Sequence, residues 1–444
     1  MASVIYNTAV VRSEYYRGKA NNQQLKSYTI TANRGTIYDR NNKILAQSTT
    51  VWDVVLSPKV IAEHDAELIE NDEPPLTATI CKTLAEMLDV DQERIEKGCQ
   101  NFANEYFIIK KKVDKDTYDK VQQFIIDNKL APYSVNLMEN SKRYYPNDSL
   151  ASSLIGFTND EGGAYGLEAY YDDYLQGTDG LIVMAKDNNG NAMPYDYENR
   201  YEASDGNSLI LTIDSTVQYY LEKNLENAVK EYKAANRATG IIMNSKTGAI
   251  IAMATAPSYN LNFPSNLSEL DEQKLADYHD QLVLDYMAGS LSDQDEIDKR
   301  IEEDMEEMEG TLRELQWKNK AVSELYFPGS VFKVITCASA LEEEVINLNS
   351  SFQCLGVYTV EDTKIHCWEL GGHGTLVLQD AITASCNPAF IQIGLALGRR
   401  MFSNYFTAFG FTERTGIDLP GEANPLYVPY ERMGNVELAS SSFG

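Results

Sequence analysis

The chain has 444 residues, of which 43 % are hydrophobic, and its formal net charge is −28 at pH 7. This length allows two or three domains with buried cores, and the hydrophobic content excludes a largely disordered chain. The negative charge argues against a nucleic-acid partner, whose phosphates would be repelled, and against a basic membrane-binding surface.

The N-terminal part of the chain, residues 1–203, is predicted to be a mixed α/β region. Within it, 60–130 is expected to be helical, because apolar residues such as Leu76, Ile80 and Leu84 recur at helical spacing. The following segment, 186–204, is rich in turn-forming residues and is predicted to connect this region to a second domain.

The second predicted domain, residues 204–444, opens with an amphipathic helix at 216–232. Two apolar runs follow, at 240–243 and 249–253, and Lys246-Thr247-Gly248 lies between them. This pattern predicts two strands joined by a hairpin turn.

An acidic insertion is predicted at about 265–316. Between Glu269 and Glu314 it holds seventeen acidic residues against four basic ones, and its apolar residues recur at helical spacing. We expect one or two amphipathic helices here. They would serve as a lid or partner-docking element, or, as the simpler interpretation, as an ordinary solvated face.

The motif Ser330-Val331-Phe332-Lys333 follows Pro328-Gly329 and leads into an apolar run, which predicts a turn entering a buried helix. Ser330 would lie in the first turn, where the positive field of the helix N-terminus favours a developing oxyanion. Lys333 would lie on the same helical face and could take the Ser330 proton if burial lowers its pKa. Taken alone, the motif would equally fit a capping serine with a solvated lysine.

A second motif, Ser385-Cys386-Asn387, lies between the predicted helical stretches 376–383 and 388–397. A turn at such a junction can point side chains into a cleft. Ser385 is a candidate proton relay and Asn387 a candidate partner for a substrate amide, although an Asn helix cap is the alternative for the motif alone. An S-x-x-K followed by an S-x-N is the active-site pattern of penicillin-binding enzymes.

The chain resembles the class B penicillin-binding proteins, which are monofunctional cell-wall transpeptidases. Further segments similar to those of the family occur in the family's order. These are Arg34-Gly35-Thr36-Ile37-Tyr38-Asp39-Arg40-Asn41, Arg143-Tyr144-Tyr145-Pro146, Gly163-Ala164-Tyr165-Gly166-Leu167-Glu168, Asp205-Gly206-Asn207-Ser208-Leu209, Leu211-Thr212-Ile213-Asp214 and Thr415-Gly416-Ile417-Asp418-Leu419-Pro420-Gly421-Glu422. Each segment is modest, but their shared order makes the resemblance specific.

The resemblance implies an α+β multidomain protein. Residues 1–203 would form a non-catalytic pedestal, and 204–444 a penicillin-binding transpeptidase domain with the α/β fold of the serine β-lactamases. Its expected place is the extracytoplasmic face of the bacterial membrane, with a glycosyltransferase of the SEDS family as a partner and without a cofactor. The family's membrane anchor would precede this chain, which contains no apolar run of about eighteen residues.

By the same resemblance, Ser330 would attack a D-Ala-D-Ala stem peptide of peptidoglycan, and β-lactams would acylate the same serine. Lys333 would be the base or an electrostatic activator, Ser385 the proton relay and Asn387 the substrate-binding residue.

The family also carries a catalytic K-T-G after its S-x-N, on a strand that supplies an oxyanion-hole amide. In this sequence the literal K-T-G, Lys246-Thr247-Gly248, precedes Ser330 and is interpreted as a turn. We therefore expect a chain truncated before the catalytic K-T-G. Strand edges near 238–255 and some helix faces would then be uncovered, and the chain alone would be inactive.

Six cysteines are too few for a disulfide scaffold, although the resemblance suggests that Cys354 and Cys367 bridge across a hairpin, as in some relatives. His373 is interpreted as part of a Gly-rich turn. No metal site is predicted, because the histidines show no ligand spacing. They are His64, His279, His366 and His373.

Two other functional classes stay open at this stage. One is a non-enzymatic binding module, which keeps the fold for scaffolding or antibiotic sensing. The other is a hydrolase, either a D,D-carboxypeptidase or a β-lactamase. The long N-terminal region with Arg34-Gly35 and Gly166-Leu167-Glu168 disfavours the hydrolase, since simple hydrolases lack it.

Overall fold

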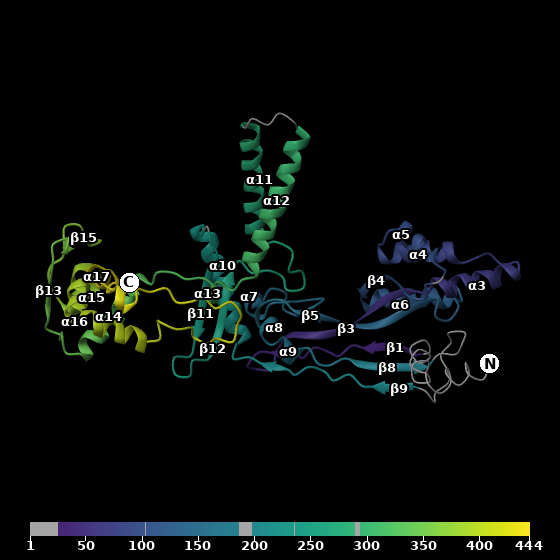
Figure 1. Ribbon diagram of the computed structural model, residues 1–444, viewed down its shortest axis with the longest axis horizontal. Coiled ribbons are helices and arrows are strands. Elements are labelled where there is room, and N and C mark those ends of the chain that lie inside the picture. Colours follow the sequence, from purple (N-terminus) through teal and green to yellow (C-terminus); the bar gives the residue numbers. More distant parts are fainter. Residues whose placement is uncertain (1–24, 103, 186–197, 235, 289–293) are drawn as a thin grey trace, which may run out of the picture. The chain divides into compact units, whose positions relative to one another are not determined.

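The computed structural model shows a chain of mixed helices and strands, which confirms the predicted α+β class. The described residues are 25–102, 104–185, 198–234, 236–288 and 294–444. They divide into two compact units, Met1–Lys318 and Asn319–Gly444 (Figure 1). The domain boundary predicted at 203/204 falls inside the first unit and stays a prediction. Most of the predicted connecting segment, 186–197, lies outside the described residues.

A five-stranded sheet forms the framework of the first unit. Its strands are β2 (Ile37–Tyr38), β3 (Ile44–Leu56), β4 (Phe107–Val113), β5 (Val135–Tyr144) and β10 (Leu209–Ile210). The long strand β3 pairs antiparallel with β2, β4 and β5, whereas β10 joins β2 in parallel. Residues 37 and 209 are thereby neighbours in one sheet, so a strand inside the predicted pedestal pairs with a strand just beyond the predicted boundary at 203/204.

Four helices accompany this sheet, namely α3 (Pro58–Glu70), α4 (Thr77–Leu88), α5 (Gln92–Cys99) and α6 (Lys115–Asp127). Their apolar faces form one core with the sheet, in which Ile80, Leu84 and Val121 are fully buried. The expectation of a helical stretch at 60–130 is right for these helices and wrong for β4. That strand reads Phe-Ile-Ile-Lys-Lys-Lys-Val, and its pairing with β3 overrides a weak local pattern.

The rest of the N-terminal region consists of short elements and a separate sheet. The sheet joins β1 (Leu25–Ile30), β8 (Gly180–Ala185) and β9 (Glu198–Tyr201) in antiparallel order (Figure 1). The short elements are α7 (Ser152–Ile155), β6 (Thr158–Asn159), β7 (Gly162–Gly163), α8 (Gly166–Tyr170) and α9 (Asp172–Leu175).

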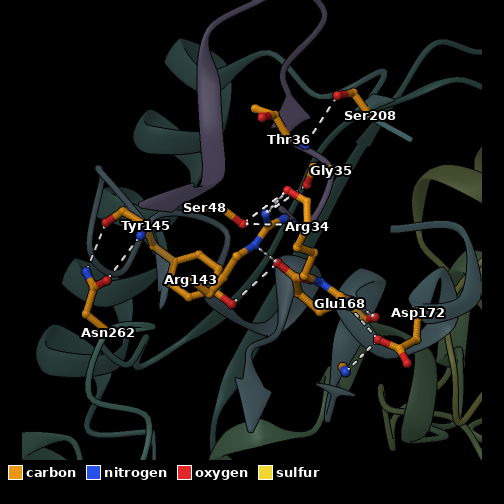
Figure 2. Close-up of polar contacts among 11 residues, drawn as sticks. Arg34, Gly35, Thr36, Ser48, Arg143, Tyr145, Glu168, Asp172, Ser208 and Asn262 are labelled. Atoms are coloured by element: carbon orange, nitrogen blue, oxygen red, sulfur yellow. Dashed lines mark hydrogen bonds and ion pairs between the residues drawn. The ribbon is translucent and has the colours of Figure 1, made fainter. Parts of the chain in front are cut away.

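Three of the segments that resemble the family converge on the buried carboxylate of Glu168, as Figure 2 shows. Arg34 Nε lies 2.6 Å from one carboxylate oxygen, and Arg143 Nε lies 2.7 Å from the other. Arg34 also pairs with Asp172 at 2.6 Å, and Arg143 donates to the Gly35 carbonyl at 2.8 Å. These segments therefore share a structural role, which is to join parts of the chain that are distant in sequence.

The predicted amphipathic helix is α10 (Ser215–Tyr232), and the predicted hairpin is the antiparallel pair β11 (Ala238–Met243) and β12 (Ile250–Ala256). Lys246-Thr247-Gly248 forms the turn, where Gly248 has a φ of +75°. The turn interpretation of this K-T-G is thus confirmed. Among the described residues β11 pairs with β12 alone, and its Ile241 and Met243 side chains are about half exposed.

The acidic insertion forms two helices, α11 (Glu269–Ala288) and α12 (Gln294–Trp317), which run side by side in opposite directions (Figure 1). The Tyr286 hydroxyl donates to Asp304 at 2.8 Å between them. At the end of α12, Trp317 Nε1 donates to the Pro264 carbonyl at 2.7 Å. The prediction of helices here is confirmed, and α12 is amphipathic, since its Ile297 and Leu312 are buried while most of its acidic residues are exposed. In α11, by contrast, the apolar Leu284 and Met287 are exposed.

The second unit packs its helices around α16 (Asn387–Ala408), whose Phe390, Ile391 and Ile393 are fully buried. Its other elements are α13 (Lys320–Ser323), the 3₁₀ helix η2 (Gly329–Phe332), α14 (Lys333–Glu342), β13 (Ser351–Cys354), β14 (Val357–Val360), β15 (Thr363–His366), β16 (Gly374–Val377), α15 (Leu378–Thr383), η3 (Tyr430–Arg432) and α17 (Asn435–Ser441). Strand β13 pairs with β16, and β14 with β15, in antiparallel hairpins. Across both units, no helix of the described residues has the length and apolar character needed to cross a bilayer.

Candidate active site

Ser330 and Lys333 lie at the junction of η2 and α14. Ser330 belongs to the 3₁₀ turn and is exposed, whereas Lys333 begins α14 and is only 4 % exposed. One helical turn separates the two residues, and Lys333 Nζ lies 3.0 Å from Ser330 Oγ. The hydroxyl is therefore accessible from solvent while the amine beneath it is buried, as nucleophilic activation by a neighbouring base requires.

Lys333 Nζ also contacts the second motif. It lies 3.0 Å from Ser385 Oγ, 2.7 Å from the Ser385 carbonyl oxygen and 2.8 Å from Asn387 Oδ1. An ammonium has three donors, so four oxygens compete for them and at least one contact is shared. The structure thus brings together all four residues that the sequence singled out, although their catalytic roles stay predictions.

The turn that carries Ser385 has an unusual backbone. Ser385 adopts a left-handed conformation, with a φ of +48°, between α15 and α16. Its amide donates to the Ile382 carbonyl at 3.0 Å, and the Cys386 amide donates to Ala381 at 3.0 Å. This tight turn ends α15 and starts α16 at Asn387, which confirms the predicted helix junction and directs Ser385 and Asn387 to the same amine.

Burial lowers the pKa of Lys333 below its usual 10.5, and the nearby Cys367 and Cys386 partly oppose this shift. A lower pKa increases the fraction of neutral amine near neutral pH. The neutral amine can accept the Ser330 proton across the 3.0 Å contact, so the site has the geometry of a nucleophile with its general base.

A pocket of about 250 Å³ adjoins these residues within the second unit. It is lined by Ser330, Lys333, Val334, Cys337, Ala338, Leu341, Ile382, Ser385 and Phe390. Most of the lining is apolar, with the polar groups gathered at one position. Such a pocket can receive a small apolar group of a ligand while its reactive atom meets Ser330.

The second unit holds another cluster, which was not predicted from the sequence. This Cys₃His cluster consists of Cys354, Cys367, His373 and Cys386. His373 Nδ1 lies 3.6 Å from the sulfurs of both Cys354 and Cys367. The expected Cys354–Cys367 disulfide is wrong, because both thiols are free and both face the imidazole. The prediction of no metal site considered the spacing of histidines alone, whereas three of these four potential ligands are cysteines.

Two family models match the chain. The model described as the penicillin-binding protein dimerisation domain matches residues 29–211, and that of the penicillin-binding protein transpeptidase domain matches residues 238–444.

Curated relatives match over nearly the whole chain. The stage V sporulation protein D of Bacillus subtilis (strain 168) is 30 % identical over 415 residues, which are 93 % of this chain and 54 % of that protein. The peptidoglycan D,D-transpeptidase FtsI of Escherichia coli (strain K12) is 26 % identical over 95 % of this chain and 61 % of its own length. The chain thus spans little more than half the length of these relatives.

Solved structures agree on the fold. Penicillin-binding protein PBP2 of Helicobacter pylori, solved in complex with MreC, gives a TM-score of 0.65 at 21 % identity and covers 95 % of this chain and 73 % of that one. Penicillin-binding protein 2X of Streptococcus thermophilus gives a TM-score of 0.64 at 22 % identity, with 94 % of this chain and 56 % of that one covered.

Proposed function

Since the chain belongs to the class B penicillin-binding proteins, we propose that it carries the acyl-transfer site of a peptidoglycan D,D-transpeptidase. The observation that supports this most directly is the set of contacts around Lys333 Nζ, which joins the hydroxyls of Ser330 and Ser385 and the Asn387 side chain within 3.0 Å. A structural lysine would not need an exposed serine as a partner, whereas an acyl-transfer site does.

In the proposed reaction, Ser330 Oγ attacks the carbonyl carbon of the penultimate D-alanine while neutral Lys333 accepts its proton. The tetrahedral intermediate collapses to an ester on Ser330 as the C–N bond breaks. Ser385 relays a proton to the nitrogen of the departing D-alanine, because its hydroxyl lies 3.0 Å from the protonated amine. An amine of a second stem peptide then attacks the ester and frees Ser330.

Asn387 is proposed to bind the substrate backbone. Its Oδ1 is occupied by Lys333 at 2.8 Å, and its Nδ2 makes a long contact of 3.4 Å with the His366 carbonyl. The amide nitrogen is therefore the group free to strengthen a bond to a substrate carbonyl. The first donor for the developing oxyanion would be the Ser330 amide, at the start of the η2–α14 helical segment.

The cellular setting follows from the family by analogy only. We propose a place on the extracytoplasmic face of the membrane, where peptidoglycan stem peptides and β-lactams are found. A SEDS-family glycosyltransferase is the proposed partner of the pedestal.

Intact-mass spectrometry after incubation with benzylpenicillin tests the nucleophile. We expect one penicilloyl adduct per chain, located on Ser330 and absent in Ser330→Ala. Ser339→Ala is the matched control, because this serine lies on the same helix and its hydroxyl donates to the Ile335 carbonyl. No adduct after prolonged incubation, or an equal adduct in Ser330→Ala, would refute the proposal.

Product analysis separates transfer from hydrolysis. The chain is incubated with a D-Ala-D-Ala peptide and an excess of a D-amino acid as acceptor. Exchange of the terminal residue supports transfer, whereas release of D-alanine without exchange would point to a carboxypeptidase.

A further inference from the structure

The Cys₃His cluster lies next to the proposed active site but takes no part in the proposed reaction. Its members come from four separate places: the end of β13, the residue after β15, the residue before β16 and the residue before α16. All three cysteines are buried, and the four potential ligand atoms lie within 4.8 Å of one another. Two hairpins and the Ser385-Cys386-Asn387 turn therefore direct three sulfurs and an imidazole to a common point.

The distances in this cluster match those around a tetrahedral metal ion. Zn²⁺ binds sulfur at about 2.3 Å and nitrogen at about 2.0 Å, which places a sulfur and a nitrogen ligand about 3.5 Å apart. His373 Nδ1 lies 3.6 Å from Cys354 Sγ and 3.6 Å from Cys367 Sγ. A ring nitrogen has one lone pair or one proton, so an ordinary hydrogen bond accounts for one of these equal contacts and not for both.

The ligand types also select the metal. Three thiolates and one imidazole form a closed tetrahedral set typical of structural Zn²⁺, whereas Mg²⁺ and Ca²⁺ require oxygen ligands. The other ring nitrogen, His373 Nε2, is buried and has no hydrogen-bond partner among the described residues. The polar contacts of the imidazole among the described residues are therefore on its Nδ1 side, which faces the sulfurs of Cys354 and Cys367.

We propose that the Cys₃His cluster binds one Zn²⁺ and that this ion holds the Ser385-Cys386-Asn387 turn in position. Cys386 is the central residue of that turn, and both of its neighbours contact Lys333 Nζ. Ser385 is in a left-handed conformation, which a non-glycine residue keeps only when its surroundings enforce it. A bond from the metal to Cys386 anchors the turn to both hairpins, so the ion positions two residues of the site without touching the substrate.

Metal content tests the site without any reference to activity. The purified chain is supplied with Zn²⁺, dialysed against metal-free buffer and measured by inductively coupled plasma mass spectrometry. We expect one Zn²⁺ per chain, lost in the double variant Cys354→Ser/Cys367→Ser and in His373→Ala. Cys81→Ser is the matched control, because Cys81 is a buried free thiol in the first unit. Co²⁺ in place of Zn²⁺ should give the visible bands of tetrahedral thiolate coordination.

Several outcomes would overturn the site. A wild-type chain without metal would do so, as would Zn²⁺ that persists in both ligand variants, which would mean an adventitious ion only. Four instead of six titratable thiols in the denatured chain would indicate a disulfide. Since His373→Ala could fail to fold, His373→Cys provides a second check, because a fourth thiolate should restore both the fold and the metal.

The positioning role rests on the proposed function and is measured separately. Removal of Zn²⁺ with a chelator should slow acylation by a fluorescent penicillin by about tenfold or more, and added Zn²⁺ should restore the rate. An unchanged rate in the metal-free chain would refute the positioning role. Stoichiometric Zn²⁺ without any acylation would refute the proposed function and leave the metal site standing.

Discussion

The buried carboxylate of Glu168 provides the sharpest test of what holds the first unit together. Figure 2 shows it between Arg34 and Arg143, with Asp172 on the far side of Arg34. The four charges cancel, and the Glu168 and Arg143 side chains are 0 % and 3 % exposed. The substitution Glu168→Gln keeps the shape but leaves one buried positive charge without compensation. It also turns an amide NH₂ toward a guanidinium donor.

Breaking a buried ion pair from one side costs about 3–5 kcal/mol of unfolding free energy. Arg34 keeps Asp172 at 2.6 Å and Arg143 keeps the Gly35 carbonyl at 2.8 Å, so we expect the lower end, about 3 kcal/mol. Replacing Arg143 by Met in the same chain removes the excess charge and should recover part of this loss.

The assay is guanidinium denaturation followed by tryptophan fluorescence in a Trp368→Phe background, in which Trp52 and Trp317 both report on the first unit. Glu93→Gln is the control, because its pair with Lys97 is 69–70 % exposed, and it should cost less than about 0.5 kcal/mol. A cost of Glu168→Gln no greater than that of this control would refute a stabilising role for the buried carboxylate, as would an Arg143→Met double variant no more stable than the single one.

Three further predictions concern groups with shifted pKa values or with a role in the site. Burial lowers the pKa of Lys333 below the ordinary lysine value of 10.5, so the rate of penicillin acylation should already rise with pH below that value. In Lys333→Arg, which stays charged, this rise should vanish and the rate should fall by about a hundredfold or more. Stopped-flow measurements of the acylation rate from about pH 6 to about pH 10 check this. A rise that persists in Lys333→Arg would exclude Lys333 as the base. Burial raises the pKa of Glu222 to about 7, although the hydrogen bonds from Gln218 and Ala151 lower it in part. Between pH 4.5 and about 7 the folded state therefore keeps the Glu222 proton while the unfolded state has lost it. The contribution of this proton to the free energy of unfolding is complete below pH 4.5 and is lost as the pH rises through about 7. Glu222→Gln keeps the acceptor oxygen and carries no charge, so above pH 7 it should be more stable than the wild type by about 3 kcal/mol. At acid pH it should show no such gain. Equal gains at both pH values in denaturant titrations would contradict a raised pKa of Glu222. Finally, Ser385→Ala should reduce acylation while Lys333 keeps its contacts with the Ser385 carbonyl and Asn387, and unchanged kinetics would argue against a relay.

The local structure at the site could be predicted from the sequence because its signals are short-range. The turn before Ser330, the helix after it and the helix junction at 385–387 follow from Pro, Gly and Asn placement and from apolar spacing. The hairpin around Lys246-Thr247-Gly248 was predictable for the same reason. The strand β4 was missed, because its three lysines weaken the local pattern and its strand conformation depends on pairing with β3.

Tertiary structure alone decided which distant groups meet. The sequence by itself determined the order of the motifs, the helical spacing that aligns Ser330 with Lys333 and the amphipathic insertion. It did not determine that Lys333 would lie within 3.0 Å of the second motif, nor that Glu168 would join Arg34 and Arg143, nor that His373 would meet three cysteines. Such contacts depend on how helices and hairpins pack, and packing places residues by the shape of the whole core rather than by their spacing along the chain.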